Sequence, residues 1–306
     1  MSTLPPARLL SLAPCLTLAG CTTSSAVPAT HTCLDLDRGA MRPLGTPADV
    51  YGVGLAYAGH LQETSQNPSP EPLVFRNAWT PPTPEVTVPS TEALIARMDD
   101  MEPGLSAALL EQEVAITPLV DWEVELGVVV LETPVPGEPP KLGFFTANDL
   151  SERSLAVLGD GPDRLRYWGA SKSHPGFLPT STEMWVPDMP VENGIPCVSL
   201  KTWVNGDLRQ SGTTSDLVYT TREILDAATE QRGAPLEPGT WILTGTPAGV
   251  ALSTPAWKVT LADLAGLDRF SRLGAVQRGG GFLEAGDVVE VAVGDLGRVR
   301  SVLVAR

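Results

Sequence analysis

The stretch DWEVELGVVV, residues 121–130, constrains the fold of this chain more than any other segment. Its valines and leucine are typical of a buried β-strand, because β-branched and aliphatic side chains pack well on a pleated surface. Glu123 and Glu125 interrupt that pattern near the start of the strand. Side chains on a strand alternate between its two faces, so both carboxylates are predicted to point the same way. Two like charges on one face of an apolar strand are costly to bury and require either solvent or a cation.

The composition favours a β-rich domain and argues against two kinds of partner. Of the 306 residues, 29 are glycine and 29 are proline, and so many turn-forming residues favour sheets joined by loops over a helical bundle. The apolar content of 42% is enough for a sizeable core. The net charge of −15 repels nucleic acid and anionic lipid headgroups, so we expect neither as a partner.

The N-terminus has the features of a leader peptide. The apolar run LLSLAPCLTLAG is too short to span a bilayer and suits the central part of a signal peptide. Its end resembles a bacterial lipobox, which implies a signal peptide over residues 1–21 and lipidation of Cys21. A plain secretory signal, cleaved near Ala26, is the alternative. We therefore expect an exported protein, lipid-anchored in the bacterial cell envelope, and Thr22 after the cysteine indicates the outer membrane, facing the periplasm.

Two further ranges follow the leader. Residues 22–48 are polar, punctuated by proline and aperiodic, and we interpret them as a tether and N-terminal extension. From Asp49 the pattern is globular, with no internal repeat and no transmembrane helix, and it predicts one β-rich α+β domain over residues 49–306. In an oxidising compartment Cys33 and Cys197 could form a disulfide, although their spacing does not show whether they meet.

Local signals place several elements within that domain. Ser90 or Thr91 is predicted to cap a helix that begins there. Asn205-Gly206 predicts the two-residue turn of a hairpin. An amphipathic pattern predicts a helix that ends at Gly233, and residues 285–306 alternate as two antiparallel strands.

Asp149, in the segment NDLSER, supplies a third acidic side chain near a predicted strand end. Together with Glu123 and Glu125 it offers carboxylate oxygens of the kind that hard cations such as Mg²⁺, Mn²⁺ or Ca²⁺ prefer. The alternatives stay open at this point. Two glutamates separated by one residue also occur on a solvated strand face, and an aspartate in this position also serves as a helix N-cap.

His60 and Glu63 have the spacing of a base and its orienting carboxylate. At positions i and i+3 they share a face if the segment is helical, so Glu63 can orient the imidazole for general-base catalysis. Lys172 lies in a loop-like segment of small residues, where a lysine beside a metal site could polarise a substrate oxygen. A structural histidine and a surface lysine are the simpler readings of the same residues.

The segment LTGTPAGV, residues 243–250, is a glycine-bracketed turn. Its backbone N–H groups and the hydroxyl of Thr246 could hold an anionic group. It lacks the lysine of a Walker motif, which argues against a nucleotide-binding loop.

The order of these motifs along the chain resembles the fumarylacetoacetate hydrolase family, in its C-terminal catalytic domain type. The sequence runs H-x-x-E, E-x-E before a valine run, N-D-x-S-x-R, K-S, V-N-G-x-x-x-Q, T-G-T-P-A-G-V and G-D-V-V-E-V. The resemblance extends from about Tyr51 to Val304, here on a chain that begins like a lipoprotein. It implies a mixed β-sandwich roll, a homodimer, and a divalent metal ion, Mg²⁺ or alternatively Mn²⁺ or Ca²⁺.

The resemblance also implies roles for individual residues, carried over motif by motif. Three acidic residues match metal ligands, a histidine and a glutamate match a water-activating pair, a lysine matches the active-site lysine, and two residues match substrate contacts. In that order they are Glu123, Glu125 and Asp149; His60 and Glu63; Lys172; and Arg153 and Thr246.

The chain departs from the family pattern at several places. Ala156 stands where a substrate-side glutamine is common, and Asn77 where a lysine is common. Residues 91–118 and 252–281 look longer than in compact members of the family. These differences predict an altered pocket and lid, and the export signal also sets the chain apart from relatives that are mostly intracellular.

The resemblance implies a metal-dependent hydrolase that cleaves a carbon–carbon bond of a small diketo or 2-oxo acid, such as an acylpyruvate, with water activated by His60. The first alternative uses the same metal site for decarboxylation or enol–keto isomerisation of a 2-oxo acid. The second alternative, from another class, is a catalytically silent, membrane-tethered binding protein.

Overall fold

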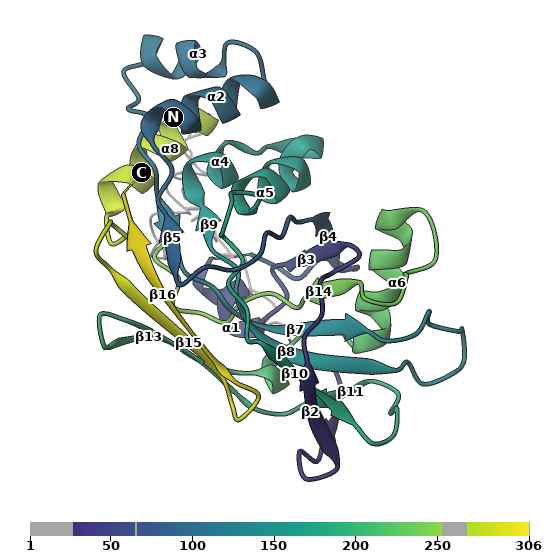
Figure 1. The fold of residues 1–306 in the computed structure, drawn as a ribbon. Coiled ribbons are helices and arrows are strands. Elements are labelled where there is room, and N and C mark those ends of the chain that lie inside the picture. Colours follow the sequence, from purple (N-terminus) through teal and green to yellow (C-terminus); the bar gives the residue numbers. More distant parts are fainter. Residues whose placement is uncertain (1–26, 65, 253–267, 306) are drawn as a thin grey trace, which may run out of the picture.

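The computed structural model describes residues 27–64, 66–252 and 268–305, and it shows two β-sheets with most of the helices gathered at one end (Figure 1). The predicted signal peptide over 1–21 and the lipidation site Cys21 lie outside the described residues. Within the described ranges, no helix combines the length and the apolar character that a bilayer crossing requires.

The larger sheet has seven strands and is mixed. The second and third strands from one edge, β3 (Val50–Gly54) and β14 (Trp241–Leu243), run parallel, and all the other neighbouring pairs are antiparallel. The strand predicted from DWEVELGVVV lies at the centre of this sheet, and all seven of its residues are buried. In spatial order the strands are β2 (Gly39–Pro43), β10 (Glu183–Pro187), β8 (Leu142–Asn148), β7 (Val124–Val130), β14 (Trp241–Leu243), β3 (Val50–Gly54) and β4 (Leu73–Arg76).

The smaller sheet has five strands and confirms two predictions. Its first two strands form the predicted hairpin, with Asn205 (φ 53) and Gly206 (φ 88) in the left-handed region that a two-residue turn requires. The two C-terminal strands pair antiparallel, as predicted. In spatial order the strands are β13 (Asp207–Thr213), β12 (Ser199–Val204), β15 (Val288–Val293), β16 (Arg298–Val304) and β5 (Glu85–Thr87); β6 (Val120–Asp121) pairs with β9 (Ser151–Glu152) in a separate ribbon.

The alternating side chains of β7 contribute to two different cores. Val124, Leu126 and Val128 belong to the main hydrophobic cluster, together with buried residues of β12, β15 and β16. Val129 belongs to a second cluster that includes Phe145. Glu123 and Glu125 are in phase with Val129, so both glutamates start the face that carries the second cluster. The two-residue period of the strand therefore fixes where the carboxylates point.

The helices begin and end where their capping residues indicate. Ser90 is the N-cap of α2, and its side chain accepts a hydrogen bond from the backbone of Ala93. Thr220 and Glu223 form a capping box at the start of α6, and Gly233 ends this helix in the left-handed conformation, as predicted. The α-helices are α1 (Ala58–Glu63), α2 (Thr91–Met101), α3 (Leu105–Glu111), α4 (Arg153–Leu158), α5 (Arg164–Lys172), α6 (Thr221–Arg232) and α8 (Arg269–Gly279).

The two long stretches that the sequence singled out, 91–118 and the described part of 252–281, come together in space. Helices from both stretches share a third hydrophobic cluster with α4 and α5, at the helical end of the molecule (Figure 1). Glu102 joins them further, because Arg269 donates to both of its carboxylate oxygens at 2.7 and 2.6 Å. Bidentate pairs of this kind fix geometry as well as adding stability. The buried residues of the cluster are Leu94, Met98, Leu105, Leu109, Ile116, Leu119, Leu155, Leu158, Tyr167 and Leu273.

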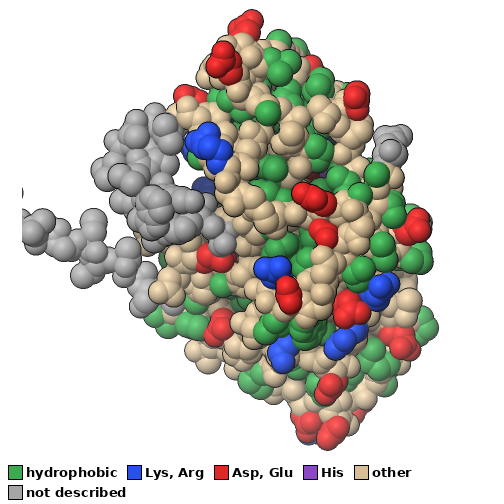
Figure 2. Space-filling view, turned by 90° about the vertical axis from the view of Figure 1, so that its left-hand side faces the viewer, with side chains coloured by type: hydrophobic (Ala, Val, Ile, Leu, Met, Phe, Trp, Pro, Cys, Tyr) green, Lys and Arg blue, Asp and Glu red, His purple; other side chains and the backbone are tan. Residues whose placement is uncertain are grey.

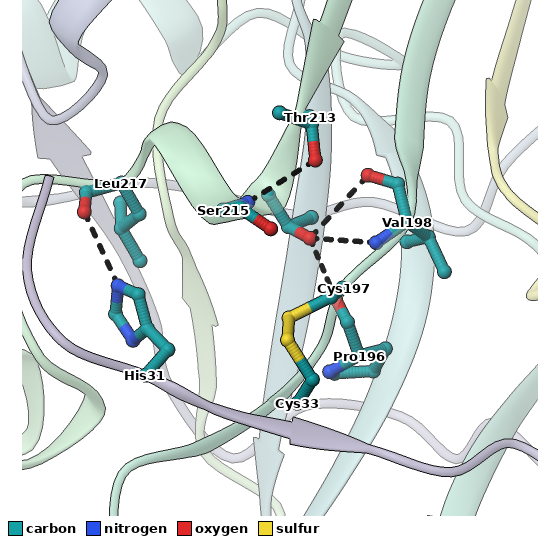
Figure 3. Close-up of a disulfide and its surroundings, with 9 residues drawn as sticks. His31, Cys33, Pro196, Cys197, Val198, Thr213, Ser215 and Leu217 are labelled. Carbon is teal, nitrogen blue, oxygen red and sulfur yellow. Dashed lines mark hydrogen bonds between the residues drawn. A yellow bond between two sulfur atoms is a disulfide. The ribbon is translucent and has the colours of Figure 1, made fainter.

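Part of the segment interpreted as a tether and extension is folded against the domain. Strand β1 (Thr32–Leu34) pairs in parallel with β11 (Gly194–Pro196), and β2 forms an edge of the seven-stranded sheet. Cys33 and Cys197 form a disulfide across 164 residues of sequence, which answers the question that their spacing left open (Figure 3). Polar composition hid these strands, because their pairing depends on partners far along the chain.

The surface on the side of the molecule drawn in Figure 2 carries acidic and basic side chains interspersed with apolar ones. No large area of a single charge is visible on that face. The high net negative charge of the chain is therefore not gathered into one patch there.

Candidate metal centre

Three acidic side chains meet where two central strands end. Glu123 directly precedes β7, Glu125 lies within it, and Asp149 directly follows β8. The two strands pair antiparallel with Val124 opposite Asn148, so the start of one lies beside the end of the other. One ligand atom from each of the three acids lies within 4.8 Å of the others.

The two simpler readings of these acids are wrong. A solvated face is excluded because Glu123, Glu125 and Asp149 are only 5%, 2% and 0% exposed. The N-cap of α4 is Glu152, whose carboxylate accepts the backbone N–H groups of Ser154 and Leu155. Asp149 is therefore free of a capping role and faces the other two acids.

Two basic side chains reach into this cluster. The Nζ of Lys172, at the end of α5, lies 2.6 Å from Glu123 Oε2 and 2.6 Å from Asp149 Oδ2. Arg153, at the start of α4, donates from Nε to Asp121 Oδ2 at 2.7 Å and from a terminal nitrogen to Glu123 Oε1. All of these groups are buried, so solvent screens their charges little.

The orientation of two of the carboxylates is fixed by neutral donors. The amide of Asn77 donates to Asp149 Oδ1 at 2.8 Å, and the backbone N–H of Gly245 donates to Glu125 Oε2 at 2.6 Å. Asp149 Oδ2 is buried and accepts no hydrogen bond from the described residues, although Lys172 lies at ion-pair distance. The ammonium of Lys172 therefore partly neutralises that oxygen, and a carboxylate oxygen with a second lone pair can still accept another ligand.

The pKa shifts of the three acids differ because the basic groups lie on one side of the cluster. Burial and the charge of Asp149 raise the pKa of Glu125 well above its usual value. Burial also raises the pKa of Asp149, against the opposing effect of Lys172. For Glu123 burial is outweighed by Lys172 and Arg153, which lower its pKa to about 2. Among the residues that the structure describes, Glu125 is the one of the three that forms no ion pair with a basic side chain.

The charge balance of the cluster matches a divalent cation. Four carboxylates, including Asp121, face two basic side chains, which leaves a formal charge of −2. At an effective dielectric constant of about 20, two unit charges about 5 Å apart repel by roughly 3 kcal/mol. Oxygen-only donors of this kind suit Mg²⁺, Mn²⁺ or Ca²⁺. The residues present therefore fit the predicted metal ion.

The predicted base and its partner lie on α1, beside the carboxylates. His60 Nδ1 is 3.3 Å from Glu63 Oε2, and the backbone N–H of Gly249 donates to both oxygens of Glu63 at 3.0 and 3.1 Å. The charge of His60 is one of the influences that lower the pKa of Glu123, so the ring lies near enough to the cluster to act on it electrostatically. If Nδ1 carries the proton shared with Glu63, Nε2 is the nitrogen left to act as a base.

The loop over residues 243–250 binds carboxylates of the protein itself. Its backbone N–H groups at Gly245 and Gly249 donate to Glu125 and Glu63, respectively. The hydroxyl of Thr246 donates to the carbonyl of Val124 at 3.0 Å and accepts from the amide of Gln210 at 2.8 Å. The loop thus links the histidine–glutamate pair to the metal ligands.

Three residues of the site were missed at the sequence level. Asp121 is fully buried, pairs with Arg153 and accepts the backbone N–H of Ala251 at 2.8 Å. The sequence could have indicated Asp121, because it lies two residues before Glu123 and therefore on the same strand face as Glu123 and Glu125. The side-chain oxygens of Asn148 and Gln210 accept the backbone N–H groups of Glu123 and Val124, both at 3.0 Å. These two hydrogen bonds fix the backbone at the start of β7, the strand that carries the metal ligands.

Comparisons with known proteins show to which family this chain is related. Residues 49–304 match the family model described as fumarylacetoacetate (FAA) hydrolase C-terminal. The chain is 28% identical over 232 residues to the 4-hydroxyphenylacetate degradation bifunctional isomerase/decarboxylase of Salmonella dublin, covering 74% of this chain and 47% of that protein. It is 26% identical over 257 residues to the 2,4-didehydro-3-deoxy-L-rhamnonate hydrolase of Sphingomonas sp. (strain SKA58), covering 82% of this chain and 71% of that protein. The chain spans about half the length of the first of these relatives.

Solved structures share the fold. Fumarylpyruvate hydrolase from Pseudomonas aeruginosa, crystallised with Mn²⁺ and pyruvate, superposes with a TM-score of 0.56 at 20% identity, covering 92% of this chain and 97% of that one. Fumarylacetoacetate hydrolase from Exiguobacterium antarcticum gives a TM-score of 0.55 at 24% identity, covering 86% of this chain and 78% of that one. At this identity the likeness concerns the fold, and it confirms the α+β class with mixed sheets that the sequence predicts.

Proposed function

The chain belongs to the fumarylacetoacetate hydrolase C-terminal family, and we propose that it is a divalent-metal-dependent hydrolase that cleaves a carbon–carbon bond in a small diketo or 2-oxo acid. The observation that carries this proposal is the buried cluster of Glu123, Glu125 and Asp149, which together with Asp121 leaves a formal charge of −2 after Lys172 and Arg153 are counted. The hydrolase names among the similar proteins support the reaction class.

We assign Glu123, Glu125 and Asp149 as the groups that would hold Mg²⁺, or alternatively Mn²⁺ or Ca²⁺. A bound ion of this kind supplies Lewis acidity to the chelated oxygens of a 2-oxo acid. Asn77 and the N–H of Gly245 keep two of these carboxylates in fixed orientations. Fixed ligands require little rearrangement when the ion binds.

His60 takes a proton from water at Nε2 while Glu63 holds the ring through Nδ1. The water oxygen then attacks the carbonyl carbon of the acyl group. The carbon–carbon bond breaks, and its electron pair leaves with the 2-oxo acid fragment as an enolate, which takes a proton at carbon. The products are a carboxylic acid and a shorter 2-oxo acid, so one water is consumed.

Lys172 remains a cation throughout these reaction steps. Burial alone would lower its pKa, but Asp149 and Glu123 raise it above the usual value for lysine. A lysine held in its charged form stabilises a developing enolate and does not serve as the base. The proton transfers therefore fall to His60.

Arg153 and Thr246 stay predictions as substrate contacts. Arg153 contacts Asp121 and Glu123, and the Thr246 hydroxyl contacts Val124 and Gln210. We infer that Arg153 chiefly balances the charge of Glu123 and that Thr246 chiefly positions the loop.

The second candidate is decarboxylation or enol–keto isomerisation of a 2-oxo acid at the same site. It is supported by the names of relatives that are an isomerase/decarboxylase and, for the human mitochondrial protein FAHD2A at 27% identity, an oxaloacetate tautomerase. In water enriched in ¹⁸O only hydrolysis places solvent oxygen in a new carboxyl group. Release of CO₂ or a shift in tautomer without that label would reject hydrolysis.

The deciding experiment is a screen of acylpyruvates and other 2-oxo acids, with and without added Mg²⁺ or Mn²⁺. A turnover that needs metal and falls by about 10²–10⁴ in His60→Ala supports the proposal. An Arg222→Ala variant, on α6, is the surface control. A wild type with no turnover above the background rate, and a His60→Ala variant equal to it, would favour a catalytically silent, membrane-tethered binding protein.

We also propose that the protein is exported and anchored through lipid on Cys21, in the bacterial cell envelope and facing the periplasm, and that it forms a homodimer. The disulfide between Cys33 and Cys197 supports export, because disulfides persist in oxidising compartments. A Cys21→Ser variant should leave the membrane fraction for the soluble one. Retention of that variant on membranes would contradict the lipid anchor, and light scattering tests the dimer.

A further inference from the structure

A polar cavity away from the metal centre is lined by α5, the helix that ends at Lys172, and by α2 of the stretch 91–118. It encloses about 480 Å³, within the range of small-molecule pockets. Its walls come from β4, α2, α5 and the last turn of α6, and Gly169 lets α5 lie close on β4, because a Cβ there would collide with the carbonyl oxygen of Arg76. The lining residues are Phe75, Arg76, Arg97, Asp100, Met101, Leu165, Arg166, Gly169, Ala170 and Gln231.

This cavity is lined by more basic than acidic side chains, on a strongly acidic protein. The lining holds three arginines, Arg76, Arg97 and Arg166, and one acid, Asp100. A comparable cavity of about 470 Å³ elsewhere on the surface carries two acids against Arg222, and Arg222 is already paired with Glu192 at 3.0 Å. The larger share of arginine among the lining residues therefore distinguishes the first cavity from the second.

Arg97 is the cation without a partner. Among the described residues its side chain makes no hydrogen bond or ion pair, and its Nε–H is buried without an acceptor. The other two arginines have acidic partners. Arg76 pairs with Asp49, and Arg166 lies 3.7 Å from Asp163 and also donates to the carbonyl of Met101 at 2.8 Å. An Nε–H that is buried without an acceptor costs free energy, and this calls for an explanation.

A neighbouring histidine reports the same uncompensated charge. Burial and, second, the charge of Arg97 lower the pKa of His174 to about 4, and its Nε2 is buried without a hydrogen-bond partner. His174 is therefore neutral near pH 7 and adds no positive charge of its own. The attraction for an anion comes from the arginines.

The remaining lining limits the kind of anion. Phe75, Met101 and Leu165 offer apolar surface beside the guanidinium groups. Guanidinium groups bind carboxylates in bidentate fashion, and an apolar wall favours a ligand with a short hydrocarbon body over an inorganic ion. We propose that this cavity, separate from the metal centre, binds a small organic acid, with Arg97 as the main contact to its carboxylate.

Titration calorimetry of the full chain in Mg²⁺ tests this proposal with hexanoate as the probe. We expect wild type to bind hexanoate, Arg97→Gln to bind at least tenfold more weakly, and Arg97→Lys to fall between them. Arg222→Gln changes the net charge equally at the other cavity and should bind within twofold of wild type. Glu125→Ala, which alters the metal centre, should also bind within twofold.

Four outcomes would overturn the proposal. They are no measurable binding by wild type, equal binding by Arg97→Gln in a folded variant, an equal loss in Arg222→Gln, and a loss confined to Glu125→Ala. Inorganic phosphate that binds as tightly as hexanoate would reject the assignment to an organic acid. Equal melting temperatures for wild type and Arg97→Gln without ligand would show that a loss of binding is not a loss of fold.

Discussion

The metal centre and the arginine-lined cavity each hold charge that no ion pair among the described residues cancels, a formal −2 in the centre and the guanidinium of Arg97 in the cavity. The surroundings of these charges differ. In the centre the charges are carboxylates that are at most 5% exposed, within 4.8 Å of one another, and their pKa values move in opposite directions. In the cavity Arg76 and Arg166 are exposed, so water screens most of their charge. Burial, more than charge number, determines how strongly each place demands a counter-ion.

The largest effect should follow from neutralising the unpaired acid of the centre. Glu125→Gln removes a metal ligand and one of the mutually repelling charges, so metal-dependent turnover should fall by more than about 10³-fold. The metal-free variant should be more stable than wild type by about 1–2 kcal/mol, since a raised pKa means that the charge is unfavourable there.

Thermal melting with and without Mg²⁺ measures both parts of that prediction. Wild type should gain stability from the ion and Glu125→Gln should not. Glu132→Gln, at an exposed ion pair with Lys141, is the matched control and should behave as wild type. A full Mg²⁺-dependent shift in Glu125→Gln would remove this residue from the ligand set.

The next largest difference is expected between arginine-to-methionine substitutions in the metal centre and in the cavity. Arg153→Met leaves Asp121 and Glu123 buried without a cation, which costs about 3–5 kcal/mol. Arg97→Met removes a guanidinium that pairs with nothing among the described residues, and it should change stability by less than about 1 kcal/mol.

Urea unfolding of the metal-free proteins gives these free energies. Because Arg153→Met could fail to fold, Arg153→Lys serves as a milder variant that keeps the charge and loses the fork geometry. Equal costs at the two positions would break the contrast between a buried and a screened arginine.

The smallest effect is a pH dependence confined to the centre. The folded pKa of Glu125 is raised above its unfolded value, so the folded state holds the proton more tightly. Stability of the metal-free protein from this group is therefore full below about pH 4.5, near the usual value for glutamate, and is lost as pH rises through the folded pKa. Glu125→Gln should lack this loss.

Metal binding should show the opposite sign at the same group. Because Mg²⁺ competes with the proton on Glu125, its affinity should rise with pH and binding should release a proton. Calorimetry in two buffers of different ionisation enthalpy measures that proton. Binding with no proton release at pH 6 would mean that Glu125 is already ionised in the metal-free centre.

Sequence reasoning went furthest where the information was local. Alternation along a strand predicts that Glu123 and Glu125 share a face, and helical spacing predicts that Glu63 meets His60, as it does at 3.3 Å. It could not bring Asp149 to them from residues alone, since that proximity follows from the pairing of β7 with β8. The order of motifs along the chain, through its resemblance to a known family, indicated that Asp149 joins the two glutamates.

The rest required tertiary structure. Strand β2 was hidden in a polar segment, because an edge strand is defined by its partner and not by a hydrophobic pattern of its own. Arg97 reads in sequence as one more charge on a helix, and its lack of a partner becomes visible only when its surroundings are known. Cavities and unpaired charges are properties of packing, which no local pattern encodes.

The disulfide at Cys33 limits how far the folded domain can lie from a lipid anchor at Cys21. If lipid is attached at Cys21, the first covalent crosslink to the folded body comes twelve residues later, since 33 − 21 = 12. A chain of that length reaches at most about 40 Å, and the catalytic body would work within that distance of the bilayer. Cys33 is the middle residue of β1, so the disulfide would transmit a force applied at the N-terminus to Cys197. The disulfide would therefore prevent such a force from separating the whole of β1 from β11.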